Sequence, residues 1–407
     1  MTLGAAKALD AADPLAHCRD RFALPDGLIY LDGNSLGALP RATGAAIGEV
    51  VERQWGEQLI TSWNRHGWID APTTLAAKLA PLIGAAADEV LVCDSTSVNL
   101  YKLLAAALEA RPGRRVILTE RQNFPTDLYI AEGLAKQLPG VELKAVERAD
   151  IAAALDDDVA VLMLTHVDYR SGERHDMAAL SAAARKAGAL SLWDLSHSAG
   201  ALELSLAADG ADLAVGCGYK YLNGGPGAPA YLYVAAALHD QLRSPISGWM
   251  GHEAPFAFDA DYRPGAGIAR FLAGTPSIIA MTALAAGLAT FDGVTMAEVE
   301  AKAAALTDTF IACVEARCPS LPLASPRDAA KRGSHVSLRH PNAYAVMQAL
   351  IGQGVIGDVR MPDLIRFGFA PLYNRHEDAF RAAEGLGEIL DNKLWDDPRY
   401  RQQSKVI

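Results

Sequence analysis

The sequence predicts an α/β protein with a mainly parallel sheet in a large domain and a smaller α+β domain after it. Short apolar runs alternate with longer helical stretches from about residue 88 to 234, the pattern of strand–helix units. The run 159–165 is apolar throughout, as in a parallel strand covered on both faces. The pattern changes after about residue 292. With 407 residues, of which 51% are hydrophobic, the chain can bury two cores.

The large domain is expected over residues 51–291. Its predicted strands are 89–93, 115–119, 159–165, 189–193, 212–217 and 230–234, and its predicted helices are 97–109, a helix from Pro125, and 176–187. The apolar run 277–291 is shorter than the roughly 20 residues that a membrane span needs. We therefore expect it to form a buried helix.

The smaller domain is expected over residues 292–407, and residues 1–50 are expected to form an N-terminal segment that packs with it. The predicted helices of this domain are 296–318, 343–353 and 375–390, and the predicted strands are 334–338, 355–359 and 364–369.

Composition excludes several classes of function. The net charge is −11, so the chain should repel phosphate backbones, and neither nucleic-acid nor membrane binding is expected. Five cysteines form no CxxC pair, which favours reduced thiols and a cytoplasmic location. Asp10 and Asp13 interrupt any signal peptide. His335 and His340 lack the partners of a metal site, so no metal is expected.

Polar residues follow the predicted strands, and in parallel sheets ligands bind at these strand ends. Residues 94–97 (Asp-Ser-Thr-Ser) begin a helix, which favours a phosphate, although taken alone these residues are more often an ordinary helix cap. Residues 124–127 (Phe-Pro-Thr-Asp) offer an aromatic face and a carboxylate, although an isolated Phe-Pro is usually a turn. Residues 166–170 follow the third of these strands. Asp194 is either a structural ion-pair partner or an anion that holds a protonated ring nitrogen.

Lys220 lies between Tyr219 and Tyr221 in the glycine-rich stretch 216–227. A loop lysine is most often a solvated charge, but one placed among aromatic rings suits a neutral amine that forms a Schiff base. A phosphate cradle, a stacking ring, a strand-end aspartate and a later lysine together are the parts of a pyridoxal phosphate (PLP) site.

These residues carry a resemblance to a known family. The chain resembles the kynureninases, PLP enzymes of the aspartate-aminotransferase-like fold (fold type I), over nearly its whole length. The matching stretches are 33–37 (GNSLG), 97–100 (SVNL), 124–127 (FPTD), 193–197 (WDLSH), 219–224 (YKYLNG), 248–252 (GWMGH) and 370–374 (APLYN). The resemblance implies a seven-stranded sheet in the large domain.

The resemblance also implies residue roles. Lys220 would form the Schiff base with PLP and move protons, Asp194 would pair with the pyridine nitrogen, and Tyr219 is a candidate acid or base. The implied cofactor shell comprises Thr96, Ser97, Phe124, Pro125, Thr126, Asp127, Thr165, Asp194, His197, Tyr219, Lys220, Trp249 and Thr275. Trp249 and Thr275 would reach the site from a partner subunit, so a homodimer is implied.

On the substrate side, Arg366 would clamp the α-carboxylate of an amino acid, because a guanidinium binds a carboxylate through two contacts. Trp63, Gly274 and Thr275 would surround the substrate ring. The implied reaction is the hydrolysis of L-kynurenine to anthranilate and L-alanine, a step of tryptophan catabolism in the kynurenine pathway. The small and weakly polar ring pocket predicts a preference for kynurenine without a ring hydroxyl.

Two alternatives stay open. A cysteine desulfurase or related lyase of the same fold would need a nucleophilic cysteine late in the chain. Cys313 and Cys318 lie in or at the end of a predicted helix and residues 320–375 contain no cysteine, which argues against it. A PLP-binding regulator without catalysis is disfavoured, because Lys220 and Asp194 are both present and no basic helix-turn-helix segment occurs.

Overall fold

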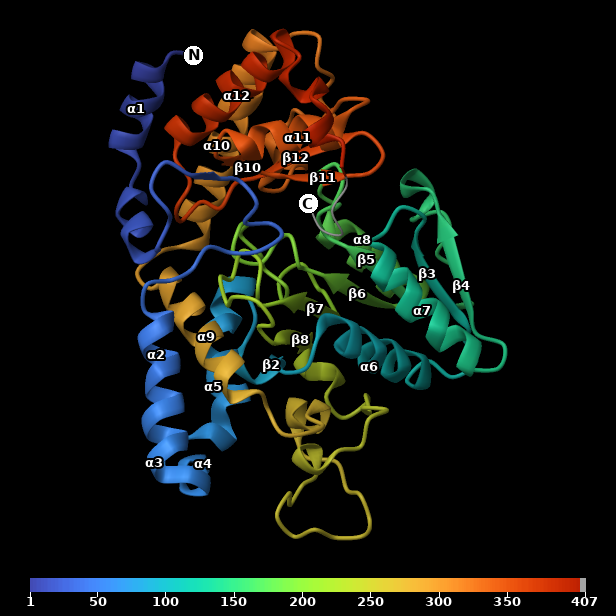
Figure 1. Cartoon of the computed structure of the whole chain (residues 1–407). Coiled ribbons are helices and arrows are strands. Elements are labelled where there is room, and N and C mark those ends of the chain that lie inside the picture. Colours follow the sequence, from blue (N-terminus) through green and yellow to red (C-terminus); the bar gives the residue numbers. More distant parts are fainter. Residues whose placement is uncertain (403–407) are drawn as a thin grey trace.

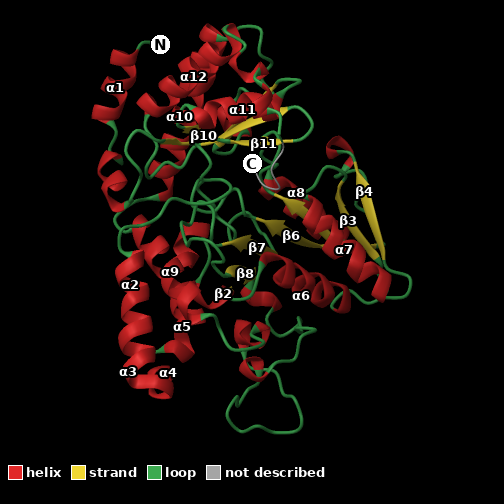
Figure 2. Ribbon diagram, viewed as in Figure 1, coloured by secondary structure: helices red, strands yellow, loops and turns green. Residues whose placement is uncertain are grey.

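The computed structural model describes residues 1–402 and is built around a seven-stranded sheet (Figure 2). Its strands are β2 (Val90–Val92), β3 (Val116–Glu120), β4 (Glu142–Val146), β5 (Val159–Thr165), β6 (Leu190–Asp194), β7 (Leu213–Cys217) and β8 (Ala230–Val234). The order is β2-β8-β7-β6-β5-β3-β4, and only β8 runs antiparallel to its neighbours. The predicted, mainly parallel sheet is therefore confirmed. Edge strand β4 was not predicted, because none of its five residues is buried and it has no apolar run.

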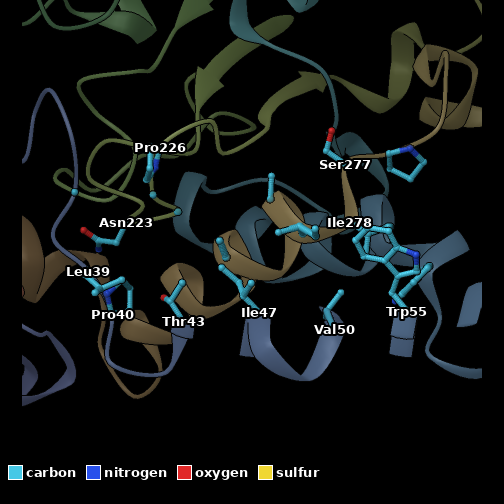
Figure 3. A pocket seen from close by; sticks show the side chains of 18 of the residues that line it. Leu39, Pro40, Thr43, Ile47, Val50, Trp55, Asn223, Pro226, Ser277 and Ile278 are labelled. Atoms are coloured by element: carbon cyan, nitrogen blue, oxygen red, sulfur yellow. The ribbon is translucent and has the colours of Figure 1, made fainter. Parts of the chain in front are cut away.

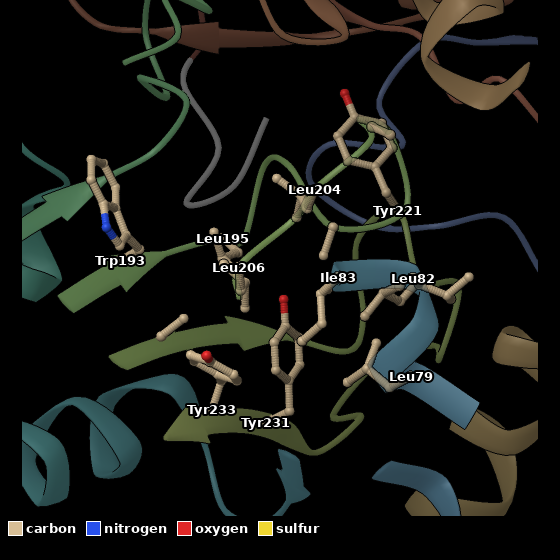
Figure 4. Close-up of a cluster of buried hydrophobic side chains, with 14 of the residues drawn as sticks. Leu79, Leu82, Ile83, Trp193, Leu195, Leu204, Leu206, Tyr221, Tyr231 and Tyr233 are labelled. Carbon is tan, nitrogen blue, oxygen red and sulfur yellow. The ribbon is translucent and has the colours of Figure 1, made fainter. Parts of the chain in front are cut away.

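Helices cover both faces of this sheet. They are α5 (Ala71–Leu79), α6 (Thr96–Glu109), α7 (Pro125–Gln137), α8 (Met177–Ala187) and α9 (Ile278–Leu288). One buried cluster joins α6 and α7 to strand residues such as Leu192. Side chains that alternate with these point to the other face, where Trp193, Tyr231 and Tyr233 pack with Leu79 of α5 (Figure 4). The sheet is thus the middle of three layers, and only its strand ends are free to hold polar groups.

The C-terminal part has its own core. It contains α10 (Met296–Arg317), α11 (Ala343–Gly352) and α12 (His376–Asp391) around an antiparallel sheet of β9 (His335–Arg339), β11 (Asp358–Arg360) and β12 (Leu364–Gly368), in the order β11-β12-β9. Phe310 of α10 lies 4.8 Å from Phe367, measured between ring centroids, inside a third buried cluster. The predicted strand 355–359 is divided in two, because Val355–Ile356 (β10) leaves this sheet and pairs elsewhere.

The N-terminal residues lie against this C-terminal part (Figure 1). The two-residue strand β1 (Ile29–Tyr30) pairs in parallel with β10. The carboxylate of Asp10, on α1 (Leu3–Ala12), accepts hydrogen bonds from the first two N–H groups of α12 at 2.6 and 3.0 Å. The helices that follow are α2 (Thr43–Glu49), α3 (Gly56–Gln58) and α4 (Ser62–Arg65). The helical run from α2 to α3 continues across residue 50, and the domain division stays a prediction.

The apolar run 277–291 forms a helix as predicted, but it is buried on one side only. Met281 and Leu284 of α9 are buried, whereas Ile279 is 42% exposed. Within residues 1–402 no single helix is long and apolar enough to cross a membrane. The bent pair Ile278–Phe291 and Met296–Arg317 meets that test only when its two halves are taken together, by length and composition alone.

Candidate active site

A cavity of about 200 Å³ lies at the carboxyl ends of the parallel strands. Its lining residues are Thr96, Ser97, Phe124, Thr126, Asp127, Thr165, Asp194, Ser196, His197, Tyr219 and Lys220. The structure thus gathers most of the predicted cofactor residues in one place, because parallel strands end at a common edge. Pro125 begins α7 beside the cavity without lining it, and Trp249 and Thr275 lie outside its lining. Ser196 was not predicted, although its place between Asp194 and His197 is a signal that could have found it.

The start of α6 forms one end of the cavity. Ser95 caps the helix, because its hydroxyl accepts a hydrogen bond from the N–H of Val98 at 3.3 Å. Thr96 and Ser97 follow in the first turn, where backbone N–H groups have no partner within the helix and the helix dipole is positive. An anion such as a phosphate is stabilised at this position.

Two buried acidic side chains also line the cavity. Asp194 accepts a hydrogen bond from the N–H of Ser196 at 2.7 Å, and Asp127 accepts one from the hydroxyl of Thr165 at 3.2 Å. Burial, together with the nearby charge of Asp194, holds the pKa of Asp127 well above its usual range. This pair therefore attracts a proton or a cationic N–H group, such as a protonated ring nitrogen.

Lys220 reaches the cavity between aromatic side chains. Its Nζ lies 5.8 Å from the ring centroid of Phe124, 5.9 Å from that of Tyr219, and 3.2 Å from Nε2 of His197. Burial and the charge of Lys220 lower the pKa of His197 well below its ordinary value, so the imidazole is neutral. A neutral imidazole can accept a hydrogen bond from Nζ of Lys220, which orients the amine.

Tyr219 separates two cavities. It lines the 200 Å³ cavity and also a second one of about 590 Å³ that includes Gly274 and Thr275. Burial raises the pKa of its phenol, so Tyr219 stays protonated and can donate a proton or a hydrogen bond.

A third and larger cavity begins beyond Thr275. Trp63 and Thr275 are among the residues that line it, and its volume is about 980 Å³. The Trp63 ring lies 5.9 Å from that of Trp68. Trp249, in the short helix Trp249–Gly251, lies on a separate segment and packs against Phe256 with ring centroids 5.7 Å apart. Within one chain, then, Trp249 does not join the cavity of Lys220.

Arg366 on β12 is fully buried and already holds several partners. Its Nε donates to Asp358 at 2.6 Å, its Nη2 also pairs with Asp358 and donates to Ser35 at 3.0 Å, and its Nη1 donates to the carbonyl of Tyr169 at 2.5 Å. A substrate carboxylate bound here would share the guanidinium with Asp358. Asp358 was not predicted, because the pattern of residues 355–360 does not indicate an ion pair.

His335 is a further residue that the prediction considered only as a metal ligand. It is fully buried, its ring centroid lies 5.5 Å from that of His197, and neither ring nitrogen has a hydrogen-bond partner among the described residues. Nowhere in residues 1–402 do three or more His, Cys, Asp or Glu side chains form a group that could hold a metal ion.

The chemistry of this donor set fits PLP. The helix start offers N–H groups to a phosphate, Phe124 offers a ring face, the buried carboxylates suit a protonated ring nitrogen, and Lys220 offers an amine. These four functions occupy one cavity, although Phe124 and Asp127 both come from the start of α7.

Proteins with similar sequences share one name. Residues 299–386 match the family model described as the Kynureninase C-terminal domain. The kynureninase of Burkholderia mallei (strain SAVP1) is 53% identical, and the match covers 98% of each chain. The kynureninase of Pseudomonas fluorescens is 51% identical, again over 98% of each chain.

Solved structures show the fold at lower identity. An apo cysteine desulfurase from Thermococcus onnurineus is 22% identical with a TM-score of 0.78, covering 93% of this chain and 98% of that one. A C-DES mutant with glycine covalently linked to the PLP cofactor is 18% identical with a TM-score of 0.76, covering 90% and 98%. At these identities the likeness concerns the fold alone.

Proposed function

The chain belongs to the kynureninase family, and from this premise we propose that it hydrolyses L-kynurenine to anthranilate and L-alanine with PLP as cofactor. The observation that carries the proposal is the single cavity that holds Lys220, the Asp194–Asp127 pair and the start of α6. This cavity combines an amine, a pair of acidic side chains and an anion site. The relatives of this chain are kynureninases.

When bound, PLP supplies an electron sink next to the α-carbon of the amino acid. We assign the phosphate to the N–H groups and hydroxyls of Thr96 and Ser97, and one ring face to Phe124. The Asp194 carboxylate would hold the proton on the ring nitrogen, since a buried anion stabilises a cationic partner.

Proton transfer is assigned to two residues. Lys220, oriented by the neutral His197, would remove the proton at the α-carbon. Tyr219, whose phenol stays protonated, would donate its proton at the ketone oxygen of the side chain as water adds. Arg366, held by Asp358, would orient the α-carboxylate.

A desulfurase reaction of the same fold is disfavoured by the cysteines. Cys313 lies on α10 and Cys318 directly after it, both buried, and burial raises the pKa of both thiols. A buried protonated thiol is a poor nucleophile. All five cysteines are free and buried, which supports a reducing compartment, so we place the enzyme in the cytoplasm. We propose that its reaction is a step of tryptophan catabolism.

We also propose that the enzyme is a homodimer. The 980 Å³ cavity opens between α2 and α9 and is lined largely by apolar side chains such as Ile47 and Ile278 (Figure 3). Leu39 is 55% exposed and Trp55 56% exposed at the same groove. An apolar patch of this kind is typical of a subunit interface. A second copy seated here would cover Thr275 and bring it, with Trp249, to the partner's cavity.

The test is anthranilate release. Purified enzyme loaded with PLP and given L-kynurenine should produce anthranilate, followed by its fluorescence, and an equal amount of alanine. The same enzyme given L-cysteine should release no sulfide. Sulfide without anthranilate would overturn the proposed reaction in favour of a desulfurase.

A further inference from the structure

An ion pair with a buried lysine joins α6 to the residue that precedes its cap, next to the helix start that lines the cavity. Lys102 of α6 has no exposed side-chain surface, and its Nζ pairs with the Asp94 carboxylate and donates to the carbonyl of Phe271 at 2.6 Å. Lysine is almost never fully buried unless it is paired. The mechanism above gives this residue no role, and it does not line the cavity.

Asp94 occupies a demanding position. It lies between the end of β2 and the helix cap Ser95, and its φ of +49° is one that residues other than glycine rarely adopt. Its side chain is 29% exposed and lines the 590 Å³ cavity together with Thr275. A carboxylate therefore stands two residues before Thr96, where we place the phosphate. Without a counter-charge it would repel that anion.

The same ammonium reaches a second segment. Phe271 ends the short helix Gly267–Phe271, and Gly274 and Thr275 follow within four residues. Lys102 thus holds the segment that carries Thr275 against the helix that begins with Thr96. Another α6 side chain fixes the turn as well, since Asn99 donates to the carbonyl of Cys93 at 2.9 Å.

We infer that Lys102 is a positioning residue for the cofactor phosphate. It neutralises Asp94, so that the N–H groups at the start of α6 face no uncompensated negative charge, and it fixes the turn 93–95 and the segment 271–275 to one helix. The inference rests on the proposed PLP site, since it assumes a phosphate at Thr96 and Ser97. It does not depend on which substrate is cleaved.

The experiment measures cofactor binding instead of turnover. Apoenzyme is titrated with PLP and with pyridoxal, which lacks the phosphate, and the ratio of the two affinities is compared among variants by the absorbance of the bound cofactor. Lys102→Met should lower the preference for PLP by about tenfold or more, because Asp94 is left unpaired beside the phosphate. Asp94→Asn should keep or raise the preference, and the double variant should return close to the wild-type ratio.

Lys302→Met is the matched control. Lys302 on α10 pairs with Asp13 at 2.6 Å, and both side chains are 7% exposed, so its loss also breaks a buried Lys–Asp pair. Because that pair joins α10 to the N-terminal segment, this variant should change thermal stability but leave the PLP-to-pyridoxal ratio unchanged.

Three results would overturn the inference: an equal loss of both affinities in Lys102→Met, a ratio lowered as much by Asp94→Asn, or a wild-type apoenzyme without preference for PLP. If Lys102→Met does not fold, the double variant decides, since a lost preference there contradicts charge neutralisation and a retained one supports it. Failure of kynurenine hydrolysis with the expected ratios would contradict the proposed reaction and not the role of Lys102.

Discussion

The cofactor cavity and the apolar groove are built in opposite ways. The cavity is small, about 200 Å³, and its polar side chains are held by partners from the same chain, such as Thr165 on Asp127. The groove is about 980 Å³, and apolar side chains around it are exposed, Trp55 by 56%. Buried polar groups need hydrogen-bond partners within the chain, whereas an exposed apolar surface can be covered later by another protein molecule. The difference suggests that one chain prepares the cofactor site and a second copy completes the substrate site.

The strongest test of the cavity removes its amine. Lys220→Ala should lower kcat by about four orders of magnitude or more, because no other side chain that lines the cavity is an amine. The fold should survive, since Lys220 is only partly buried. Borohydride reduction of the native enzyme followed by peptide mapping should place the pyridoxyl label on Lys220. Label on Lys102 would show that the wrong lysine was assigned.

The groove is tested by a charge on its wall. Ile279→Arg should shift the enzyme to a monomer and lower kcat/KM by roughly a hundredfold, because a charge in an apolar interface is costly and the site then lacks Thr275 of the second copy. Sedimentation velocity and anthranilate release measure the two effects. Tyr129→Arg on α7 is the control, since Tyr129 is 66% exposed and lies outside the groove. A dimer of full activity in Ile279→Arg would contradict the proposed interface.

Arg366 tests whether a buried guanidinium that is paired with Asp358 still binds substrate. Arg366→Lys should lower kcat/KM for kynurenine by about ten- to a hundredfold with the cofactor spectrum unchanged, because an ammonium cannot make two-point contact with a carboxylate. Arg360→Lys is the matched control, since Arg360 pairs with the same Asp358 at 2.7 Å but is 30% exposed. The proposed role of Arg366 is wrong if the substitution lowers kcat/KM equally for a kynurenine amide, which lacks the carboxylate.

Substrate choice tests the boundary between the two regions. The predicted ring pocket of Trp63, Gly274 and Thr275 offers little to a ring hydroxyl, so kynurenine should be preferred over 3-hydroxykynurenine by about ten- to a hundredfold in kcat/KM. Gly274→Ser should reduce this preference, since a Cβ at Gly274 meets open space and the new hydroxyl gives the ring a partner. Equal rates on both substrates in the wild type would refute the pocket assignment.

The smallest expected effect is one of pH. Burial lowers the pKa of His166, beside the cavity, to about 3, below the ordinary 6.5. The unfolded chain therefore binds more protons than the folded one, and stability is lost as pH falls from about 6.5. In the wild type, Nδ1 of His166 contacts the hydroxyl of Ser198 at 2.9 Å, and an asparagine can keep this contact. The His166→Asn variant should therefore lose less unfolding free energy as the pH falls than the wild type, by up to about 1.4 kcal/mol per pH unit. Urea unfolding at pH 7 and pH 5 measures this difference, and parallel losses in both proteins would refute it.

The sequence by itself determined the architecture and indicated which polar residues gather at the strand ends. Fully apolar runs such as β5 predicted central parallel strands, and Asp194 and Lys220 stood out because strand ends must converge at one edge. Residues 216–227 carried the same signal, since glycines mark a backbone that a ligand approaches closely. The local pattern of apolar residues is enough to predict an element when that pattern shows which of its side chains are buried.

Only the tertiary structure decided how these residues are paired and what remains uncovered. The ion pairs Arg366–Asp358 and Lys102–Asp94 join residues whose spacing announces no contact, because their geometry depends on strand register and on a left-handed turn. Edge strand β4 lacked an apolar run because none of its five side chains is buried, whereas the other edge strand, β2, is buried throughout. The exposed side of α9 could not be foreseen either, because its composition is apolar on every face. Which face is left for a partner depends on where the sheet lies.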